Sequence, residues 1–327
     1  MLALLIAFAL VQAEAQQKCR ALSLEGGGSH GAYEAGCLQV LVESLPAEDV
    51  EWDVITGISI GAFNTGLASQ FPKGEESAMV DMLLEYWINF NTSSTAYKQW
   101  PGGYVEGLTI KSSLLDGSPG GVYYRRYFKH LPERKASVGT VNLDTGVFTD
   151  FDESLSFEEW GNAVSASGSP PLYFPPVYFR DSWWVDGGVA INLDVFSAIE
   201  RCLEVVDNQA DVIVDMIYDD HQEALDPETS FNSLEVFNRV RSIQSADSSN
   251  WYYYNARIAY PQAQFRYLLV PSEQLPGGFL PLDFNRPDVE WEIQLGRNDT
   301  QKVLTGSQQP RETPAERRKR QTIYATD

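Results

Sequence analysis

Cysteine and histidine are scarce in this chain of 327 residues, which has three of each. They are Cys19, Cys37 and Cys202, and His30, His130 and His221. Three cysteines form at most one disulfide, which excludes a disulfide-rich scaffold and leaves at least one thiol that we expect to be a small buried side chain. No spacing of these residues matches a metal site, so we expect neither a metal nor another cofactor.

Lysine and arginine are also few relative to aspartate and glutamate. The chain has 24 Lys and Arg residues against 45 Asp and Glu residues, a formal net charge of −21 at pH 7. This balance argues against nucleic acid as a partner and against electrostatic capture on anionic membranes. A lipid would have to be met through apolar contact, in transient encounters with a membrane or micelle surface. The sequence indicates no protein partner.

Internal repeats are lacking too, and the composition of 43% hydrophobic and 21% charged residues suits one large globular domain or two small ones. Predicted strands alternate with predicted helices, which favours an α/β fold: a three-layer sandwich whose mostly parallel central sheet is covered on both faces. We expect strands at 19–24, 52–58, 136–142, 146–151, 183–186, 212–217 and 264–270, and helices at 32–45, 62–71, 75–90, 157–167, 193–206 and 233–245.

The two ends of the chain differ from the rest. Residues 1–15 combine a short apolar run with a small-x-small pattern at Ala13 and Ala15, which predicts a secretory signal peptide; a first buried strand or helix is the alternative. Residues 308–327 are polar and predict a disordered tail. The basic run 317–320 within the tail would be solvated, or would serve as a processing or anionic-surface site. The folded domain is then expected at 18–305.

Two N-glycosylation sequons agree with secretion: Asn91-Thr92-Ser93 and Asn298-Asp299-Thr300. We therefore expect a glycoprotein that is secreted or resides in the lumen of the secretory pathway.

The first candidate functional motif is Gly57-Ile58-Ser59-Ile60-Gly61, between a predicted buried strand and a predicted helix. A turn this sharp leaves no room for side chains at Gly57 and Gly61, and it exposes the Ser59 hydroxyl near the positive end of the helix dipole. Ser59 is therefore a candidate nucleophile.

The second motif is the glycine loop Gly26-Gly27-Gly28-Ser29-His30-Gly31, again between a strand and a helix. Such a loop presents free backbone amides to an anion, either a phosphate or the oxyanion of a tetrahedral intermediate. We favour the oxyanion, because the next strand ends in the Ser59 turn rather than in the acidic residue of a dinucleotide site.

The third motif is Asp186-Gly187-Gly188, where two glycines allow another group to approach the Asp186 carboxylate closely. An ordinary Asp-Gly-Gly turn is the alternative. Two further segments are rich in aromatic residues. Residues 172–178 predict an ordered loop that forms either one wall of an acyl-chain pocket or plain packing. Residues 91–121 predict an irregular surface excursion or lid with exposed side chains at Tyr97, Trp100 and Tyr104.

With these motifs in this order, residues 20–304 resemble the patatin-like phospholipase family, which includes plant patatins and the catalytic domain of neuropathy target esterase. The stretches Thr140-Val141-Asn142-Leu143-Asp144-Thr145-Gly146 and Phe174-Pro175-Pro176-Val177 add to the likeness. The resemblance implies a carboxylic ester hydrolase acting on glycerolipids, of phospholipase A or lysophospholipase type. It assigns Ser59 as nucleophile, Asp186 as general base, and the amides of Gly26, Gly27 and Gly28 as oxyanion donors, with Gly31, Gly57, Gly61, Gly187 and Gly188 as supporting glycines.

Two positions depart from the family pattern. His30 stands where the family often has Arg or Lys, which could weaken the oxyanion site, and Asn192-Leu193-Asp194 stands in place of Asn-x-Pro, which we expect to alter only a turn.

Two other functions remain open. One is an ordinary α/β-hydrolase with a triad of Ser59, an aspartate and His221. The other is a secreted lipid-binding or storage glycoprotein that keeps the fold without catalysis.

Overall fold

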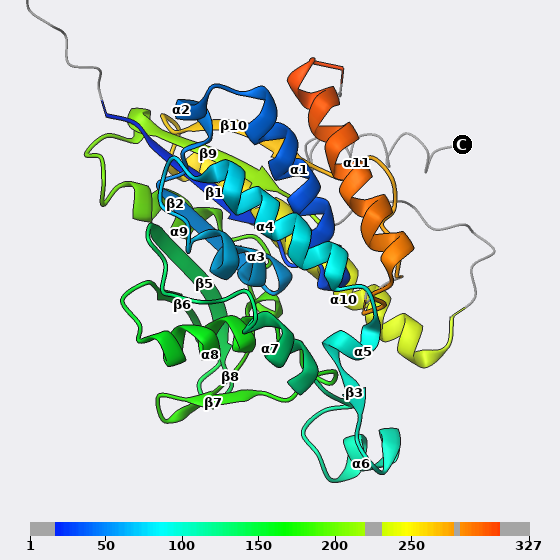
Figure 1. The fold of residues 1–327 in the computed structure, drawn as a ribbon. Helices are drawn as coiled ribbons and strands as arrows, with labels where there is room; N and C mark the ends of the chain where they lie inside the picture. The colour runs from blue at the N-terminus through cyan, green and yellow to red at the C-terminus, as the bar shows by residue number, and fades with distance from the viewer. Residues whose placement is uncertain (1–16, 220–230, 278–281, 308–327) are drawn as a thin grey trace, which may run out of the picture.

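An eight-stranded sheet organises the molecule, in the order β10-β9-β1-β2-β5-β8-β7, with β6 paired to β5 off this path (Figure 1). The computed structural model describes residues 17–219, 231–277 and 282–307. The strands of this sheet are β1 (Cys19–Leu24), β2 (Val54–Ile58), β5 (Lys135–Asn142), β6 (Phe148–Asp152), β7 (Val177–Phe179), β8 (Ser182–Asp186), β9 (Val212–Ile217) and β10 (Gln264–Leu269). β10, β9, β1, β2 and β5 pair in parallel, whereas the pairs made by β6, β7 and β8 are antiparallel. The predicted α/β class is confirmed.

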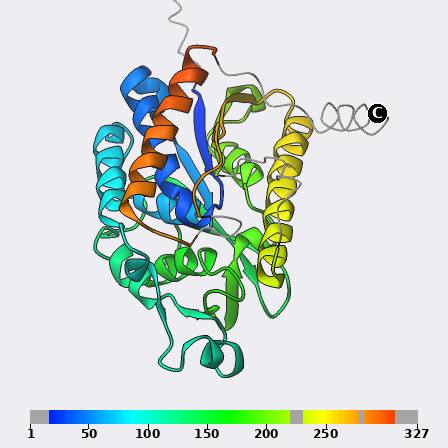
Figure 2. The same ribbon diagram turned by 90° about the vertical axis from the view of Figure 1, so that its right-hand side faces the viewer.

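Helices cover both faces of the sheet (Figure 2). The helices of the described residues are α1 (Gly31–Ser44), α2 (Ala47–Val50), α3 (Ile60–Ala68), α4 (Glu76–Asn89), α5 (Ser93–Ala96), α6 (Gly103–Thr109), α7 (Ser118–Tyr124), α8 (Phe157–Ser167), α9 (Val195–Cys202), α10 (Ser233–Ala259) and α11 (Arg286–Leu304). Along β1, Leu22 and Leu24 belong to the core shared with α1, α3, α4, α8 and α11, whereas Cys19 and Ala21 belong to the core shared with α9 and α10. This alternation explains why β1 is buried on both faces and gives the three predicted layers.

One disulfide joins the sheet to a covering helix. Cys19 in β1 is bonded to Cys202 at the end of α9, with their Cα atoms 5.5 Å apart. The remaining thiol, Cys37, is buried in α1, and burial raises its pKa. The expectation of at most one disulfide and one buried thiol is confirmed.

The C-terminal helices differ from the sequence prediction. α10 continues to Ala259, well past the predicted end at residue 245, and α11 was not predicted at all. The sequence of α11 is polar, but the helix packs closely on α1: a Cβ on Gly36 would overlap the Ile293 carbonyl, and a Cβ on Gly296 would overlap the Tyr33 carbonyl. Such tertiary contacts leave no strong signal in one sequence.

Residues 91–121 are more regular than predicted. They contain α5, α6 and the start of α7, and a two-stranded antiparallel ribbon of β3 (Lys98–Gln99) and β4 (Leu115–Asp116). Tyr104 is exposed as predicted, but Tyr97 and Trp100 are half-buried. The Trp100 indole donates to the Ser113 carbonyl at 3.0 Å, which holds it against the ribbon.

Candidate active site

Ser59 forms a strained turn at the end of β2. Its backbone has φ 54° and ψ −118°, a combination that residues other than glycine rarely adopt. Because β2 ends at Ile58 and α3 begins at Ile60, this one residue makes the whole change of direction. The structure therefore has the strand-to-helix turn that the sequence predicted.

Steric contacts require glycine at the positions two residues before and two residues after Ser59. A Cβ on Gly57 would overlap the Gly61 backbone, and a Cβ on Gly61 would overlap the carbonyl oxygens of Leu24 and Glu25. The turn is thus packed directly against the end of β1, and the predicted lack of space at both positions is confirmed.

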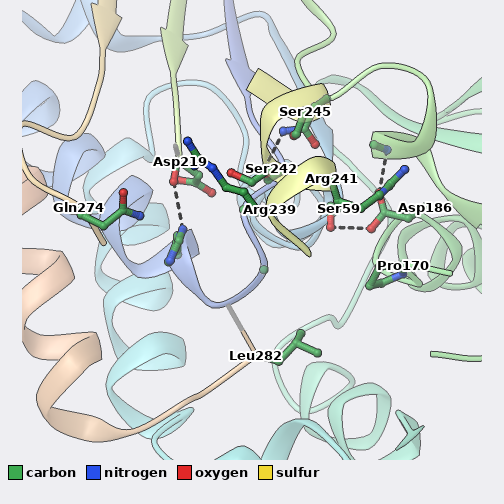
Figure 3. A pocket seen from close by; sticks show the side chains of 16 residues that line it. Ser59, Pro170, Asp186, Asp219, Arg239, Arg241, Ser242, Ser245, Gln274 and Leu282 are labelled. Atoms are coloured by element: carbon green, nitrogen blue, oxygen red, sulfur yellow. Dashed lines mark hydrogen bonds between the residues drawn. The ribbon is translucent and has the colours of Figure 1, made fainter. Parts of the chain in front are cut away.

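Strand register brings Asp186 to Ser59. Ile58 in β2 lies opposite Gly139 in β5, and the next residue of β5, Thr140, lies opposite Asp186 at the end of β8. Asp186 is therefore level with the residue that follows Ile58. The Ser59 hydroxyl donates to Asp186 Oδ2 at 2.7 Å, as Figure 3 shows.

Burial dominates the electrostatics of Asp186. The side chain is almost fully enclosed, and this desolvation raises the pKa of its carboxyl from 3.8 to about 6. Hydrogen bonds from Ser59 and from the Gly188 amide (2.7 Å to Oδ1) and the charge of Arg241 act in the opposite direction. A carboxylate with this pKa is ionised at neutral pH and is a stronger base than an exposed aspartate.

Gly187 and Gly188 make this close packing possible. A Cβ on Gly187 would overlap the Gly139 carbonyl, and a Cβ on Gly188 would lie 2.7 Å from Asn192 Oδ1 and 3.0 Å from Asp186 Oδ1. The two glycines are required by the approach of one backbone carbonyl and two side chains, as the sequence suggested.

The glycine loop offers two free amides rather than three. Within residues 17–219, 231–277 and 282–307, the amides of Gly27 and Gly28 donate to no protein group. The Gly26 amide donates to the Asn192 carbonyl at 3.0 Å, so its prediction as an oxyanion donor is wrong for this conformation. Gly28 has φ 67°, which favours glycine, and Gly27 and Gly28 line the same cavity as Ser59.

Two residues that hold the site were not singled out from the sequence. Asn192 donates from Nδ2 to the Gly26 carbonyl at 2.8 Å, so it fixes the glycine loop from both sides. Ser167, at the end of α8, accepts a hydrogen bond from the Ser59 amide at 2.9 Å and donates to the Gly139 carbonyl at 2.7 Å. For Asn192, which keeps the first residue of the family's Asn-x-Pro pattern, that match was a usable signal, whereas a serine at a helix end carries none.

His30 links the glycine loop to two distant segments. Its Nδ1 lies 3.0 Å from the Asp219 carbonyl and its Nε2 lies 2.8 Å from the Pro276 carbonyl. Burial lowers the pKa of His30 to about 4, against the two carbonyls, which favour the charged ring. His30 is therefore neutral at pH 7 and does not supply the charge that Arg or Lys would bring to this position.

Two cavities meet at Ser59 and Gly28. One is apolar, has a volume of about 450 Å³, and is lined by aromatic and small side chains of α3, α4 and α7 and by the 170–177 loop. Its lining includes Phe63, Tyr86, Phe90, Phe174, Pro175, Pro176, Val177 and Phe284. The segment predicted as one wall of a pocket does line one.

The second cavity is smaller and polar, with a volume of about 130 Å³. Figure 3 shows that α10 contributes Arg239, Arg241, Ser242 and Ser245 to it. The reacting atoms of Ser59 thus lie between an apolar space and a space lined by guanidinium and hydroxyl groups.

Several predicted features lie outside the described residues: the signal peptide at 1–15, the tail at 308–327, and His221 of the alternative triad. Of the two sequons, Asn298 is exposed on α11, and Asn91 is half-buried with its amide donating to the Ile88 carbonyl at 3.2 Å. Gly31 opens α1, where a Cβ would overlap the Trp87 ring. No cluster of three or more His, Cys, Asp or Glu side chains in the described part of the chain could hold a metal ion.

The sheet, the strained serine and the free glycine amides describe an α/β protein with the geometry of a serine hydrolase. A model of the patatin-like phospholipase family matches residues 22–199, more than half of the chain. The chain belongs to the patatin-like phospholipase family.

Individual relatives are more distant. A cGAMP-activated phospholipase from Escherichia coli (strain TW11681) is 27% identical over 203 residues, which are 56% of this chain and 55% of that protein. The chain thus spans about half the length of this curated relative. The crystal structure of VipD from Legionella pneumophila matches with 13% identity and a TM-score of 0.40, covering 90% of this chain and 68% of VipD.

Proposed function

We propose that the protein hydrolyses acyl esters of glycerolipids, as a phospholipase A or lysophospholipase, through a dyad of Ser59 and Asp186. The observation that carries the proposal is the 2.7 Å hydrogen bond from the Ser59 hydroxyl to Asp186, beside the free amides of Gly27 and Gly28. Family membership and the phospholipase named among the relatives support lipid as the substrate class.

In acylation, Ser59 is the nucleophile, Asp186 transfers the proton, and the glycine amides stabilise the oxyanion. Ser59 Oγ attacks the ester carbonyl carbon while its proton passes to Asp186 Oδ2, and the amides of Gly27 and Gly28 donate to the oxyanion that forms. The tetrahedral intermediate collapses, the bond from carbonyl carbon to alkoxy oxygen breaks, and Asp186 returns the proton to the departing alcohol. The products are the alcohol and an acyl ester of Ser59.

Deacylation repeats the same steps with water. Asp186 takes a proton from water as it attacks the acyl carbonyl, and the amides again stabilise the oxyanion. The bond to Ser59 Oγ breaks, and the proton returns to Ser59 as the fatty acid leaves. Neither half of the cycle needs a histidine.

Each of the two cavities suits a different part of the proposed substrate. The apolar cavity of about 450 Å³ is suited to the acyl chain. The polar cavity would take the alcohol side, where Arg239 and Arg241 favour a phosphate-bearing alcohol over an uncharged one.

A lipid panel tests the proposed substrate. Fatty acid release is measured with phosphatidylcholine, lysophosphatidylcholine and monoacylglycerol, all in chelator, for the protein and for Ser59→Ala. We expect release from the phospholipids by the parent protein and none by the variant. Lipid binding without fatty acid release by the parent would favour the non-catalytic binding protein instead.

Secretion and glycosylation are part of the same proposal. The disulfide between Cys19 and Cys202 supports an oxidising compartment, since such bonds rarely persist in a reducing one. N-terminal sequencing of the protein from culture medium would locate the cleavage near residue 15. Digestion with an N-glycosidase would reveal glycans at Asn91 and Asn298 as a loss of mass.

A further inference from the structure

Residues 98–116, here called the knob, project from the body of the molecule. Figure 1 and Figure 2 both show the knob, which contains β3, α6 and β4, extending beyond the layers of helices. The ion pair between Lys98 and Asp116 (3.2 Å) and the β3–β4 ribbon close its base.

The outer end of the knob is apolar. Four exposed large hydrophobic side chains lie within seven consecutive residues, and Ile110 has 76% of its surface accessible. They are Tyr104, Val105, Leu108 and Ile110. Several exposed large apolar side chains within one short segment are typical of an interaction site.

The polar groups of the knob are satisfied internally. Lys111 pairs with Glu106 (3.4 Å) and lies 4.9 Å from the centre of the Trp100 ring, and Glu106 also accepts from the Gly102 amide at 2.7 Å. The segment contains two lysines, one glutamate and one aspartate, so its net charge is zero in a chain of charge −21. The knob can therefore enter an apolar medium without burying an unpaired charge.

The knob is continuous with the apolar cavity. Its inner end, Asp116, lines that cavity together with the next two residues, Gly117 and Ser118. The amides of Leu114 and Leu115 donate to the carbonyls of Leu172 and Tyr173 at 2.7 and 3.0 Å, within the 170–177 loop that forms another wall of the cavity. A lipid surface in contact with the knob would thus lie beside the space proposed for the acyl chain.

We propose that the knob docks the protein on lipid bilayers by inserting Tyr104, Val105, Leu108 and Ile110 into the interface, and that it does so without requiring anionic lipid. The choice of a bilayer as the partner rests on the proposed lipid hydrolase function. Aromatic and aliphatic side chains with flanking lysines are the composition of elements that lie in the membrane interface. No helix in the described residues could cross a membrane.

The test measures vesicle binding apart from hydrolysis. All proteins carry Ser59→Ala, so that no product accumulates, and co-flotation with vesicles of pure phosphatidylcholine is quantified. The knob variant is Leu108→Glu with Ile110→Glu. The matched control is Ile258→Glu at the end of α10, which has the same 76% exposure as Ile110. Thermal melting verifies that each variant is folded.

We expect the knob variant to lose binding by on the order of tenfold or more, since two apolar side chains no longer enter the interface, and the control to bind like the parent. Fluorescence of Trp100, adjacent to the inserted residues, would shift to shorter wavelength on binding in the parent. Adding anionic lipid would not strengthen binding.

Three results would overturn the proposal: no binding of the parent to these vesicles, equal binding by the knob variant, or loss of binding in Ile258→Glu. Self-association that the knob variant abolishes would assign the surface to a second copy of the chain instead. Because binding is measured in Ser59→Ala, it can succeed while ester hydrolysis fails, or fail while hydrolysis succeeds, so the two proposals are judged separately.

Discussion

Gly26 and Asn192 hold each other through two hydrogen bonds: the Gly26 amide donates to the Asn192 carbonyl at 3.0 Å, and Asn192 Nδ2 donates to the Gly26 carbonyl at 2.8 Å. The pair anchors the glycine loop to the segment that follows the Asp-Gly-Gly turn. The position of the free amides relative to Ser59 therefore depends on one asparagine side chain.

Asn192→Ala tests this positioning role. The variant loses the bond to the Gly26 carbonyl, so the amides of Gly27 and Gly28 are less well placed for the oxyanion. We expect kcat on a soluble ester to fall roughly tenfold to a hundredfold with little change in KM, because the lost interaction acts mainly in the transition state. Asn255→Ala on the exposed part of α10 is the control. A rise in KM at unchanged kcat would instead place Asn192 in ground-state binding.

Asp186→Asn separates catalysis from stability. Loss of the base should lower turnover by about a hundredfold to ten-thousandfold. The same change should raise the melting temperature, because burial disfavours the Asp186 carboxylate.

The stability gain has a defined pH dependence. The carboxyl pKa rises from 3.8 to about 6 on folding, so the folded state binds the proton more tightly and the penalty of ionisation grows as pH rises through this range. Asp186→Asn should therefore stabilise by at most about 3 kcal/mol at pH 8 and far less at pH 4, since one pKa unit corresponds to about 1.4 kcal/mol. Melting curves at both pH values measure it, and an equal gain at both would contradict the assignment.

Arg241→Gln should move the acidic limb of the pH profile. The free protein should lose activity below about pH 6 as Asp186 is protonated, and Arg241 lowers the pKa of that carboxyl. Removing the cation should shift the limb of kcat/KM to higher pH on any ester and reduce hydrolysis of phospholipid more than that of monoacylglycerol. An unchanged profile would show that Arg241 does not act on Asp186.

Gly61→Ala should be strongly destabilising. Its Cβ would overlap the carbonyls of Leu24, the last residue of β1, and of Glu25, which follows it, and this backbone cannot move aside cheaply. We expect a loss of a few kcal/mol in the free energy of unfolding, measured in urea. Gly161→Ala, in the middle of α8 with open space around it, is the matched control and should stabilise by about 0.5 to 1 kcal/mol.

Local signals in the sequence were enough for much of the fold. β1, β9 and α8 have the predicted bounds, because two mainly apolar segments and a helix capped by Ser156 and Glu159 each specify their own ends. α11 was missed because its polar sequence is stabilised by close contact with α1, which joins residues that are far apart in the chain.

The same difference between local signals and distant contacts applies to the candidate active site. The sequence singled out Ser59 and Asp186, and the sheet register brings them together. It could not show that the Gly26 amide is already occupied, since the partner, Asn192, lies 166 residues away. The contact of Ser167 with the serine turn depends on the packing of α8 in the same way, and no local pattern predicts it.

The most direct test of the dyad is to trap the acyl-enzyme. The parent protein, Ser59→Ala and Asp186→Ala are mixed with a short-chain nitrophenyl ester in chelator, quenched within the first turnovers, and examined by intact-mass and peptide mass spectrometry. We predict an acyl adduct on the peptide that contains Ser59 in the parent, none in Ser59→Ala, and greatly slowed formation in Asp186→Ala. An adduct on another residue, or undiminished ester hydrolysis by folded Ser59→Ala, would contradict the assignment of Ser59 as the nucleophile.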